Sequence, residues 1–205
     1  KGNILAGVSD CMNIMKYKHQ FHMNKNDLYC NAGMYLVDLK KWREEKVEDK
    51  IIKRIHEQNG NVFFFEQTLM NWSCSGKILQ LPPKYNAYTL FWAFTYKNLI
   101  CWRKPNAFYL ESEVEEAKDN PIIIHFTRNF YMLSRPWIKG CDHPKTKEYV
   151  KYKLLTPWKQ LEEDNRSKKS IRRYKLWHII PQRILAIGAG VIYNEVRPKL
   201  WWKNE

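Results

Sequence analysis

The sequence predicts an α/β domain, and three observations carry that prediction. Short apolar runs such as Ile4–Val8 and Pro121–Phe126, the latter with three β-branched residues in a row, are typical of buried strands. The segment between them includes Val47–Gln58, where apolar residues recur at helical spacing. A chain of 205 residues with 44% apolar composition is long enough for one packed domain. Strands that alternate with helices define the α/β class.

Expected strands and helices alternate along the chain. The first strand, Ile4–Val8, ends at Ser9 and Asp10, and Val47–Gln58 places its isoleucines on one helix face with charges opposite. Val62–Phe65 leads into a helix that starts near Glu66 and ends near Trp72. The other expected strands are Met34–Leu39, Ile78–Leu81, which Pro82 and Pro83 end, and Pro121–Phe126, which a proline opens.

Two segments lack a clear pattern. Tyr85–Phe108 is rich in aromatic residues without a regular period, and we expect a long loop over a binding cleft. Glu162–Ser170 is polar and reads as a linker, so the edge of the globular domain is expected near residue 160. Ile171–Tyr193 is helical in propensity, although Gly188 and Gly190 weaken that prediction.

The positive charge gathers at the C-terminal end of the chain. The formal net charge is +14, and residues 165–205 carry ten Lys or Arg against two acids, which gives +8 for this tail alone. Such a tail indicates an anionic partner, either a membrane surface or nucleic acid. Basic residues here interleave with apolar ones and with Trp201-Trp202, a composition that favours the surface of an anionic membrane. A helix packed on the domain remains the alternative.

Cysteine usage and the N-terminus set further bounds. The five cysteines are odd in number and irregularly spaced, which favours free thiols in a reducing cytosol. No apolar stretch reaches the roughly 20 residues of a membrane-spanning helix. The chain starts at Lys1 without a signal peptide, and we expect this to be a cut end of a longer protein.

Three short motifs carry candidate chemistry. Asn31-Ala32-Gly33 would let the backbone approach a ligand closely, with an amide for sugar hydroxyls, although composition alone favours a plain turn. Glu66-Gln67 places a carboxylate beside a carboxamide at a helix start, where a solvated cap is the alternative. His125 ends a strand, where it would serve as a metal ligand or as a hydrogen-bonded core histidine.

The ordered combination of these motifs resembles glycosyltransferase family 8 over roughly residues 3–160. The elements are Ile4–Asp10, Asn31–Gly33 with the following Asp38-Leu39 and Trp42-Arg43, Glu66-Gln67, His125, and Arg135-Pro136-Trp137. The resemblance implies a fold of the GT-A type, with residues 1–160 as the C-terminal part of the catalytic domain and 161–205 as a basic amphipathic tail. It also implies retaining transfer from a UDP-sugar with a divalent metal, Mn²⁺ or Mg²⁺.

The resemblance assigns roles residue by residue. Asp10, Asn31 and Ala32 would contact the donor sugar. Gln67 would lie beside the anomeric carbon, with Glu66 orienting sugar hydroxyls. His125 matches the metal ligand, and Arg135 matches a lysine that contacts the diphosphate.

The chain departs from the family pattern in three ways. Thr68 replaces the second acid that flanks Gln67, and Glu66 replaces an Asp. The segment from His125 to Arg135 is longer and contains no glycine, which leaves the diphosphate contact of Arg135 open. No Asp-x-Asp sequence occurs, so two carboxylate ligands are missing and this chain alone should bind metal poorly.

Together these residues predict a retaining hexosyltransferase acting on a glycan or lipid-linked saccharide. Its expected location is cytoplasmic, on the inner face of the cell membrane. We expect no nucleic-acid partner, because the sequence contains no RNP, KH or zinc-finger pattern. The alternatives are a nucleic-acid-binding protein that stacks bases on its aromatic residues, and a non-catalytic protein on the membrane surface.

Overall fold

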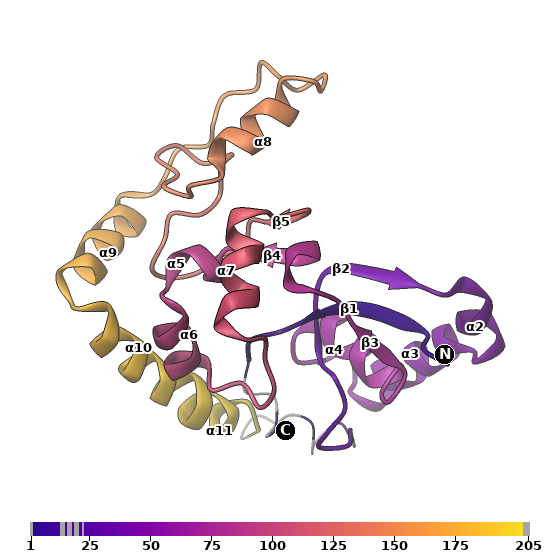
Figure 1. Cartoon of the computed structure of the whole chain (residues 1–205). Helices are drawn as coiled ribbons and strands as arrows, with labels where there is room; N and C mark the ends of the chain where they lie inside the picture. Colours follow the sequence, from indigo (N-terminus) through magenta and orange to yellow (C-terminus); the bar gives the residue numbers. More distant parts are fainter. Residues whose placement is uncertain (1, 13–14, 16–17, 19–20, 22, 203–205) are drawn as a thin grey trace.

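The computed structural model describes residues 2–202 except 13–14, 16–17, 19–20 and 22 (Figure 1). The side chains of Trp201 and Trp202, and Lys203, lie outside the described part, so the tail prediction is untested there. The strands are β1 (Leu5–Ser9), β2 (Cys30–Val37), β3 (Ile78–Gln80), β4 (Ala87–Tyr88) and β5 (Ile124–His125). The helices before β5 are α2 (Leu39–Glu44), α3 (Val47–Glu57), α4 (Phe65–Ser73), the 3-10 turn η1 (Pro83–Asn86), α5 (Leu90–Ala93), α6 (Tyr96–Arg103) and α7 (Glu111–Asp119). After β5 come α8 (Thr146–Lys153), α9 (Lys168–Ile179), α10 (Gln182–Val191), the π-helical turn η2 (Ile192–Val196) and α11 (Arg197–Trp202).

The described strands form two small sheets and confirm the predicted α/β class. In the first sheet the order is β2-β1-β3, with β1 antiparallel to β2 and parallel to β3. In the second sheet β4 pairs with β5 in parallel. The β1–β2 register shifts between Gly7 and Ser9, so Ser9 lies opposite Cys30. This irregularity brings the end of β1 next to the start of β2.

Two strands differ in length from their predictions. β2 begins at Cys30, four residues before Met34, so Asn31–Gly33 lie inside the strand instead of before it. β5 contains only Ile124 and His125, and the prediction of a long strand over Pro121–Phe126 was wrong. The backbone N–H groups of Ile122 and Ile123 both donate to the carbonyl of Lys84 in the preceding turn, at 2.9 and 3.1 Å. These bonds engage the two residues before β5, and the pairing with β4 begins only at Ile124.

The aromatic segment is part of the core, and its prediction as a loop over a cleft was wrong. Residues 85–108 fold into η1, β4, α5 and α6, and Tyr88, Phe91 and Trp102 are almost fully buried. The helices here are too short for a 3.6-residue period to appear in the sequence, which is why the pattern was missed. Burial of these rings also removes them from any role in stacking nucleic-acid bases.

The C-terminal helices run along one side of the domain (Figure 1). The helical prediction for this segment is confirmed, with a break at Ile180 and Pro181 between α9 and α10. α10 packs on α6: a Cβ on Gly190 would lie only 3.2 Å from the carbonyl oxygen of Trp102, so glycine permits this close approach. Asn194 Nδ2 donates to the same carbonyl at 2.9 Å. The packed-helix alternative therefore describes α10.

No single described helix is long and apolar enough to cross a membrane. Helix α9 and the segment Gln182–Leu200 have that length and composition only together, and a 113° bend separates them.

Candidate active site

Sequence-distant segments meet where β1 ends and β2 begins. Asp10 follows β1 directly, and its backbone N–H donates to the carbonyl of Tyr29 at 3.0 Å. The first turn of α4 supplies Gln67, and η1 supplies Asn86. β5 ends at His125, which lies opposite Tyr88 in the parallel pair. The carboxyl ends of parallel strands are a common place for ligand sites in α/β folds.

Asp10 is the acceptor at the centre of a hydrogen-bond network. Its Oδ2 accepts from Asn31 Nδ2 at 2.9 Å and from Gln67 Nε2 at 3.1 Å. Its Oδ1 accepts from the backbone N–H of Met12 at 3.0 Å. A carboxylate oxygen has room for two acceptor contacts, so Oδ1 keeps one free for a ligand hydroxyl.

Asn31 links Asp10 to a second asparagine. Its Oδ1 accepts from the backbone N–H of Gly33 and from Asn86 Nδ2, both at 3.0 Å. Asn86 is fully buried, yet its own Oδ1 has no hydrogen-bond partner among the described residues. An unpaired buried acceptor is costly, so a donor from a ligand would relieve that cost.

Gln67 is held at both ends of its amide. Its Nε2 donates to Asp10, and its Oε1 accepts from the backbone N–H of Ala32 at 3.0 Å. The Tyr29 hydroxyl also interacts with this amide. The amide therefore has a fixed orientation before any ligand arrives.

The base of α4 is tied to β2 below Gln67. Asn71, fully buried, accepts from the backbone N–H of Cys30 at 2.6 Å and donates to its carbonyl at 2.8 Å. Thr68, where the family has its second acid, is also fully buried and pairs with the Tyr29 hydroxyl at 2.9 Å. Thr68 thus packs the helix against the strand and does not face the site as a charge.

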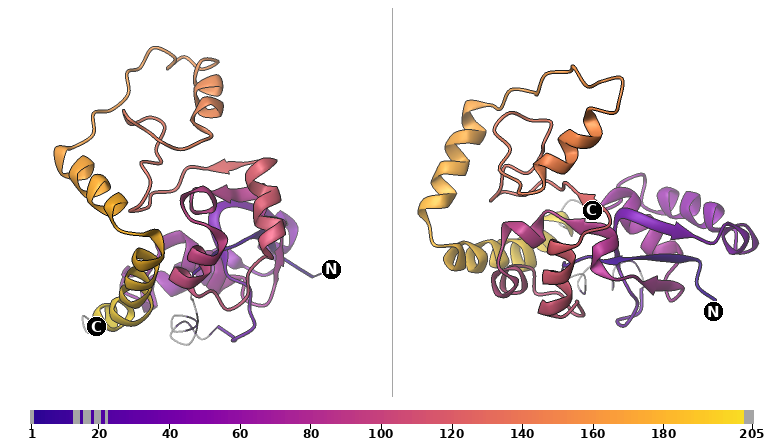
Figure 2. Two further views of the ribbon diagram at one scale, coloured as in Figure 1. Left: turned by 60° about the vertical axis from the view of Figure 1, so that its left-hand side comes forward. Right: turned by 45° about the horizontal axis from the view of Figure 1, so that its top comes forward.

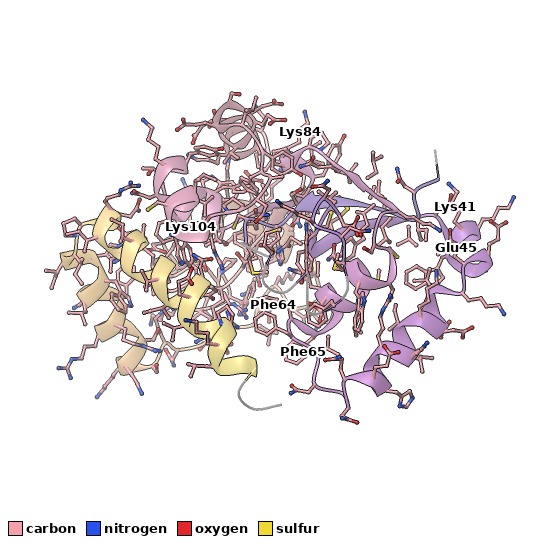
Figure 3. The ribbon with its side chains drawn as sticks, turned by 90° about the horizontal axis from the view of Figure 1, so that it is seen from below. Lys41, Glu45, Phe64, Phe65, Lys84 and Lys104 are labelled. Carbon is pink, nitrogen blue, oxygen red and sulfur yellow. The ribbon has the colours of Figure 1, made fainter. Side chains whose placement is uncertain are left out.

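α4 is entered through a strained backbone. Phe64 and Phe65 have φ angles of +59° and +47°, a region that costs a bulky residue roughly 1–2 kcal/mol. Figure 3 shows both rings between α4 and the C-terminal helices, and the Arg197 guanidinium lies 5.2 Å from the Phe64 ring centroid. The sharp entry places Gln67 in the first turn, directly against β2.

His125 lies against Gly33, which explains why residue 33 lacks a side chain. A Cβ at Gly33 would be 2.1 Å from His125 Nδ1 and 2.6 Å from Asn86 Oδ1. His125 Nδ1 is buried without a hydrogen-bond partner among the described residues. Burial lowers the pKa of His125 below its ordinary value; Asp10 opposes this shift and Arg135 adds to it. The imidazole is therefore neutral at pH 7, with an unused ring nitrogen at the site.

The remaining predicted residues lie outside the network. Arg135 is near enough to affect the pKa of His125, and its guanidinium lies 5.3 Å from the Trp137 ring centroid. Glu66 is exposed at the start of α4 and makes no hydrogen bond to a described residue. The structure thus brings together Asp10, Asn31, Ala32, Gln67 and His125, places Arg135 beside them, and leaves Glu66 at the rim.

Sequence reasoning missed Asn86. It follows the Pro82-Pro83 turn and precedes the buried pair Ala87-Tyr88, inside the segment predicted as a loop. A lone polar residue between buried neighbours was the available signal, because a buried asparagine needs partners.

The residues described do not form a metal site by themselves. His125 Nδ1 fits as one ligand, since it is buried, unpaired and neutral at pH 7. No group of three or more His, Cys, Asp or Glu that could hold a metal ion occurs in the described part of the chain. The nearby Asp10 carboxylate already accepts three hydrogen bonds. Hard divalent cations require several oxygen ligands, which this set does not provide.

Solved structures place the fold in a known class. The apo structure of the bifunctional glycosyltransferase WbbM matches 85% of this chain and 30% of its own, with 17% identity and a TM-score of 0.58. The galactosyltransferase LgtC, solved with donor and acceptor sugar analogues, matches 84% of this chain and 56% of its own, with 15% identity and a TM-score of 0.54. The fold is therefore the GT-A type of glycosyltransferases.

The sequence comparison gives the family. The model of glycosyl transferase family 8 matches residues 1–139, and the chain belongs to this family. General stress protein A of Bacillus subtilis is 26% identical over 140 residues, which cover 66% of this chain and 45% of the relative. The lipopolysaccharide 1,2-glucosyltransferase of Escherichia coli K12 is 30% identical over 171 residues, 80% of this chain and 45% of the relative. The chain spans about half the length of these curated relatives.

Proposed function

We propose that this chain provides the sugar-binding part of a retaining hexosyltransferase that uses a UDP-sugar. The observation that carries the proposal is the pair of unpaired buried atoms, Asn86 Oδ1 and His125 Nδ1, which face Gly33 beside the Asp10–Asn31–Gln67 network. A sugar carries several hydroxyls that donate and accept at short range, which suits this set of amide, carboxylate and imidazole groups.

The site residues suit the charges of a glycosyl transfer. The free contact of Asp10 Oδ1 and the unpaired oxygen of Asn86 would orient sugar hydroxyls, which fixes the reacting geometry. The fixed amide oxygen of Gln67 would support the oxocarbenium-like transition state through its partial negative charge, without a stable covalent bond to the sugar. Arg135 would stabilise the charge that develops on the departing diphosphate. Glu66, at the rim of the site, would orient hydroxyls of the bound sugar. No step here is assigned to a metal, because the described residues do not form its site.

The acceptor would be a glycan or lipid-linked saccharide. A relative named as a lipopolysaccharide glucosyltransferase supports this choice. The exposed face of α9 and α10 supports a place on an anionic membrane, which for this chain would be the cytoplasmic face. Apolar residues on that face are Leu176, Ile179, Ile184, Ile187 and Val191, with Arg172, Lys175 and Arg183 among them.

The proposal is tested by UDP release from UDP-glucose and UDP-galactose with Mn²⁺ and a lipopolysaccharide core oligosaccharide as acceptor. We expect Asp10→Asn to lower the rate by about 100-fold, because donor hydroxyls lose their anchor. Asp49→Asn, an exposed change of the same charge on α3, should leave the rate unchanged. NMR of the product should show the anomeric configuration of the donor. An inverted product, or equal rates in the two variants, would contradict the proposal.

A further inference from the structure

A basic cavity of about 670 Å³ lies beside the candidate active site, between the segment 128–138 and the start of α9. Both views of Figure 2 show the chain after β5 leaving the body of the domain and returning to it through α9. The cavity is lined by five arginines, Arg103, Arg128, Arg135, Arg166 and Arg173. None of the described lining residues is acidic. A volume of this size suits a small ligand.

Three of these arginines carry buried donors that no described residue satisfies. Arg103 Nε and Nη1, Arg166 Nε and Nη2, and Arg135 Nε are buried without hydrogen-bond partners among the described residues. Every ion pair between described residues uses a lysine, so no described carboxylate balances these five charges. Arg103 also stacks over the rings of Trp102 and Tyr193, whereas Arg128 and Arg173 are exposed. Buried N–H donors without acceptors are costly, which indicates an anion as their missing partner.

Asp142 lies near this wall of the cavity without lining it. It interacts with the Tyr174 hydroxyl and, after burial, helps raise the pKa of Tyr174 to about 12. Tyr174 itself lines the cavity.

The wall formed by α9 combines hydrogen-bond donors for an anionic group with apolar lining for a sugar ring. Ser167 caps this twelve-residue helix by accepting from the N–H of Ser170 at 3.2 Å, and both serines line the cavity. A helix N-terminus adds positive potential to that of the arginines. The Trp177 ring, which is only partly buried, forms apolar lining beside these donors. A small anion alone would leave this ring uncovered.

We propose that this cavity binds a phosphate monoester carried by the acceptor saccharide. The proposal rests on the hexosyltransferase function and gives its acceptor a chemical identity. Arg135 lies at the border with the donor site, while Arg166 and Arg173, from α9 and its approach, belong to the cavity alone. Guanidinium groups bind phosphate through paired hydrogen bonds, which distinguishes a phosphorylated saccharide from its neutral form.

Calorimetric titration of the full chain with glucose 6-phosphate, glucose and UDP tests the proposal. We expect glucose 6-phosphate to bind at least about tenfold tighter than glucose. The double variant Arg166→Gln/Arg173→Gln should lose roughly tenfold or more in affinity for glucose 6-phosphate and keep that for UDP. The matched control Arg172→Gln/Lys175→Gln changes the same charge on α9 away from the cavity, and should bind like the original chain.

Three results would overturn the proposal. Equal binding of glucose and glucose 6-phosphate, or no binding of either, removes the phosphate preference. An equal loss in both double variants means general attraction by charge. A loss of binding to phosphatidylglycerol vesicles in the cavity variant, without any loss for glucose 6-phosphate, assigns the arginines to a lipid headgroup. These titrations involve no sugar transfer, so failure of the transferase assay and failure of the cavity assignment remain separate results.

Discussion

Gly33 shows how one missing side chain shapes the site. A Cβ there would overlap His125 Nδ1 at 2.1 Å, and the residue has no positive φ that would strain an alanine. We therefore expect Gly33→Ala to displace His125 and Asn86 and to lower the rate of UDP release by about 100-fold. Gly188→Ala on α10, where a Cβ meets open space, should keep the activity and add up to about 1 kcal/mol of stability. Full activity in Gly33→Ala would mean that the glycine does not set this geometry.

His143 makes stability depend on pH. Its ring packs edge-on against Trp92 and Phe126, its Nδ1 accepts from the N–H of Lys145 at 3.1 Å, and its Nε2 is buried without a described partner. Burial, and then Lys145, lower its pKa to about 4. The unfolded chain binds this proton near pH 6.5 and the folded chain near pH 4, so stability falls as the pH falls through that window.

The pH effect can be measured by urea unfolding between pH 4 and pH 7.5. His143→Asn, whose side-chain oxygen can still accept from Lys145, should show a shallower loss of stability at acid pH. His56→Asn, on the exposed face of α3, should keep the original slope. Equal slopes in all three proteins would show that His143 protonation does not matter for folding.

At the scale of elements, sequence patterns located the strands and helices whose apolar residues repeat regularly, and missed the elements that lack such a repeat. β1, α3 and β3 lie within one residue of their predicted bounds, because their apolar residues follow a strand or helix repeat. Family resemblance, and not local pattern, marked Asp10, Asn31 and Gln67, which the structure brings together in one hydrogen-bond network. The length of β5 and the helices of residues 85–108 depend on long-range contacts, and no local pattern records them. An example is the Lys84 carbonyl, which accepts from Ile122 and Ile123 just before β5 begins.

The joint between α4 and β2 can be tested through Asn71. Asn71→Ala would leave the buried N–H of Cys30 without its side-chain partner, and its carbonyl with the Tyr35 hydroxyl at 3.3 Å in place of a 2.8 Å bond from Asn71. A buried group left unpaired costs roughly 1–3 kcal/mol. We expect a loss of about 2–4 kcal/mol in urea unfolding, together with lower activity because α4 carries Gln67. Asn106→Ala, at an exposed position, should stay within about 0.5 kcal/mol. A loss in Asn71→Ala as small as this control would mean that the joint contributes little.

At the scale of the whole molecule, the C-terminal helix α10 has one face packed on the domain and an opposite face that is exposed. One face of α10 packs on α6 through Ala186 and Gly190, so the tail is integral to the domain. The opposite face exposes Ile184, Ile187 and Val191, on a helix that continues a strongly basic segment. Packed helices with an apolar outer face combined with positive charge are suited to the surface of an anionic membrane.

Binding to vesicles tests this outer face with the intact chain. We expect sedimentation with phosphatidylglycerol vesicles, weaker binding as NaCl rises, and little binding to neutral phosphatidylcholine. Ile184→Ser/Ile187→Ser removes side chains that are 60% and 50% exposed, so folding should survive while vesicle affinity drops about tenfold. Ile52→Ser, 47% exposed on α3, is the control and should bind normally. Equal vesicle binding by the original chain and both variants would contradict a membrane role, because it would exclude insertion of α10. Tighter binding to single-stranded RNA at the same salt concentration would also contradict it, because the positive charge would then serve nucleic acid.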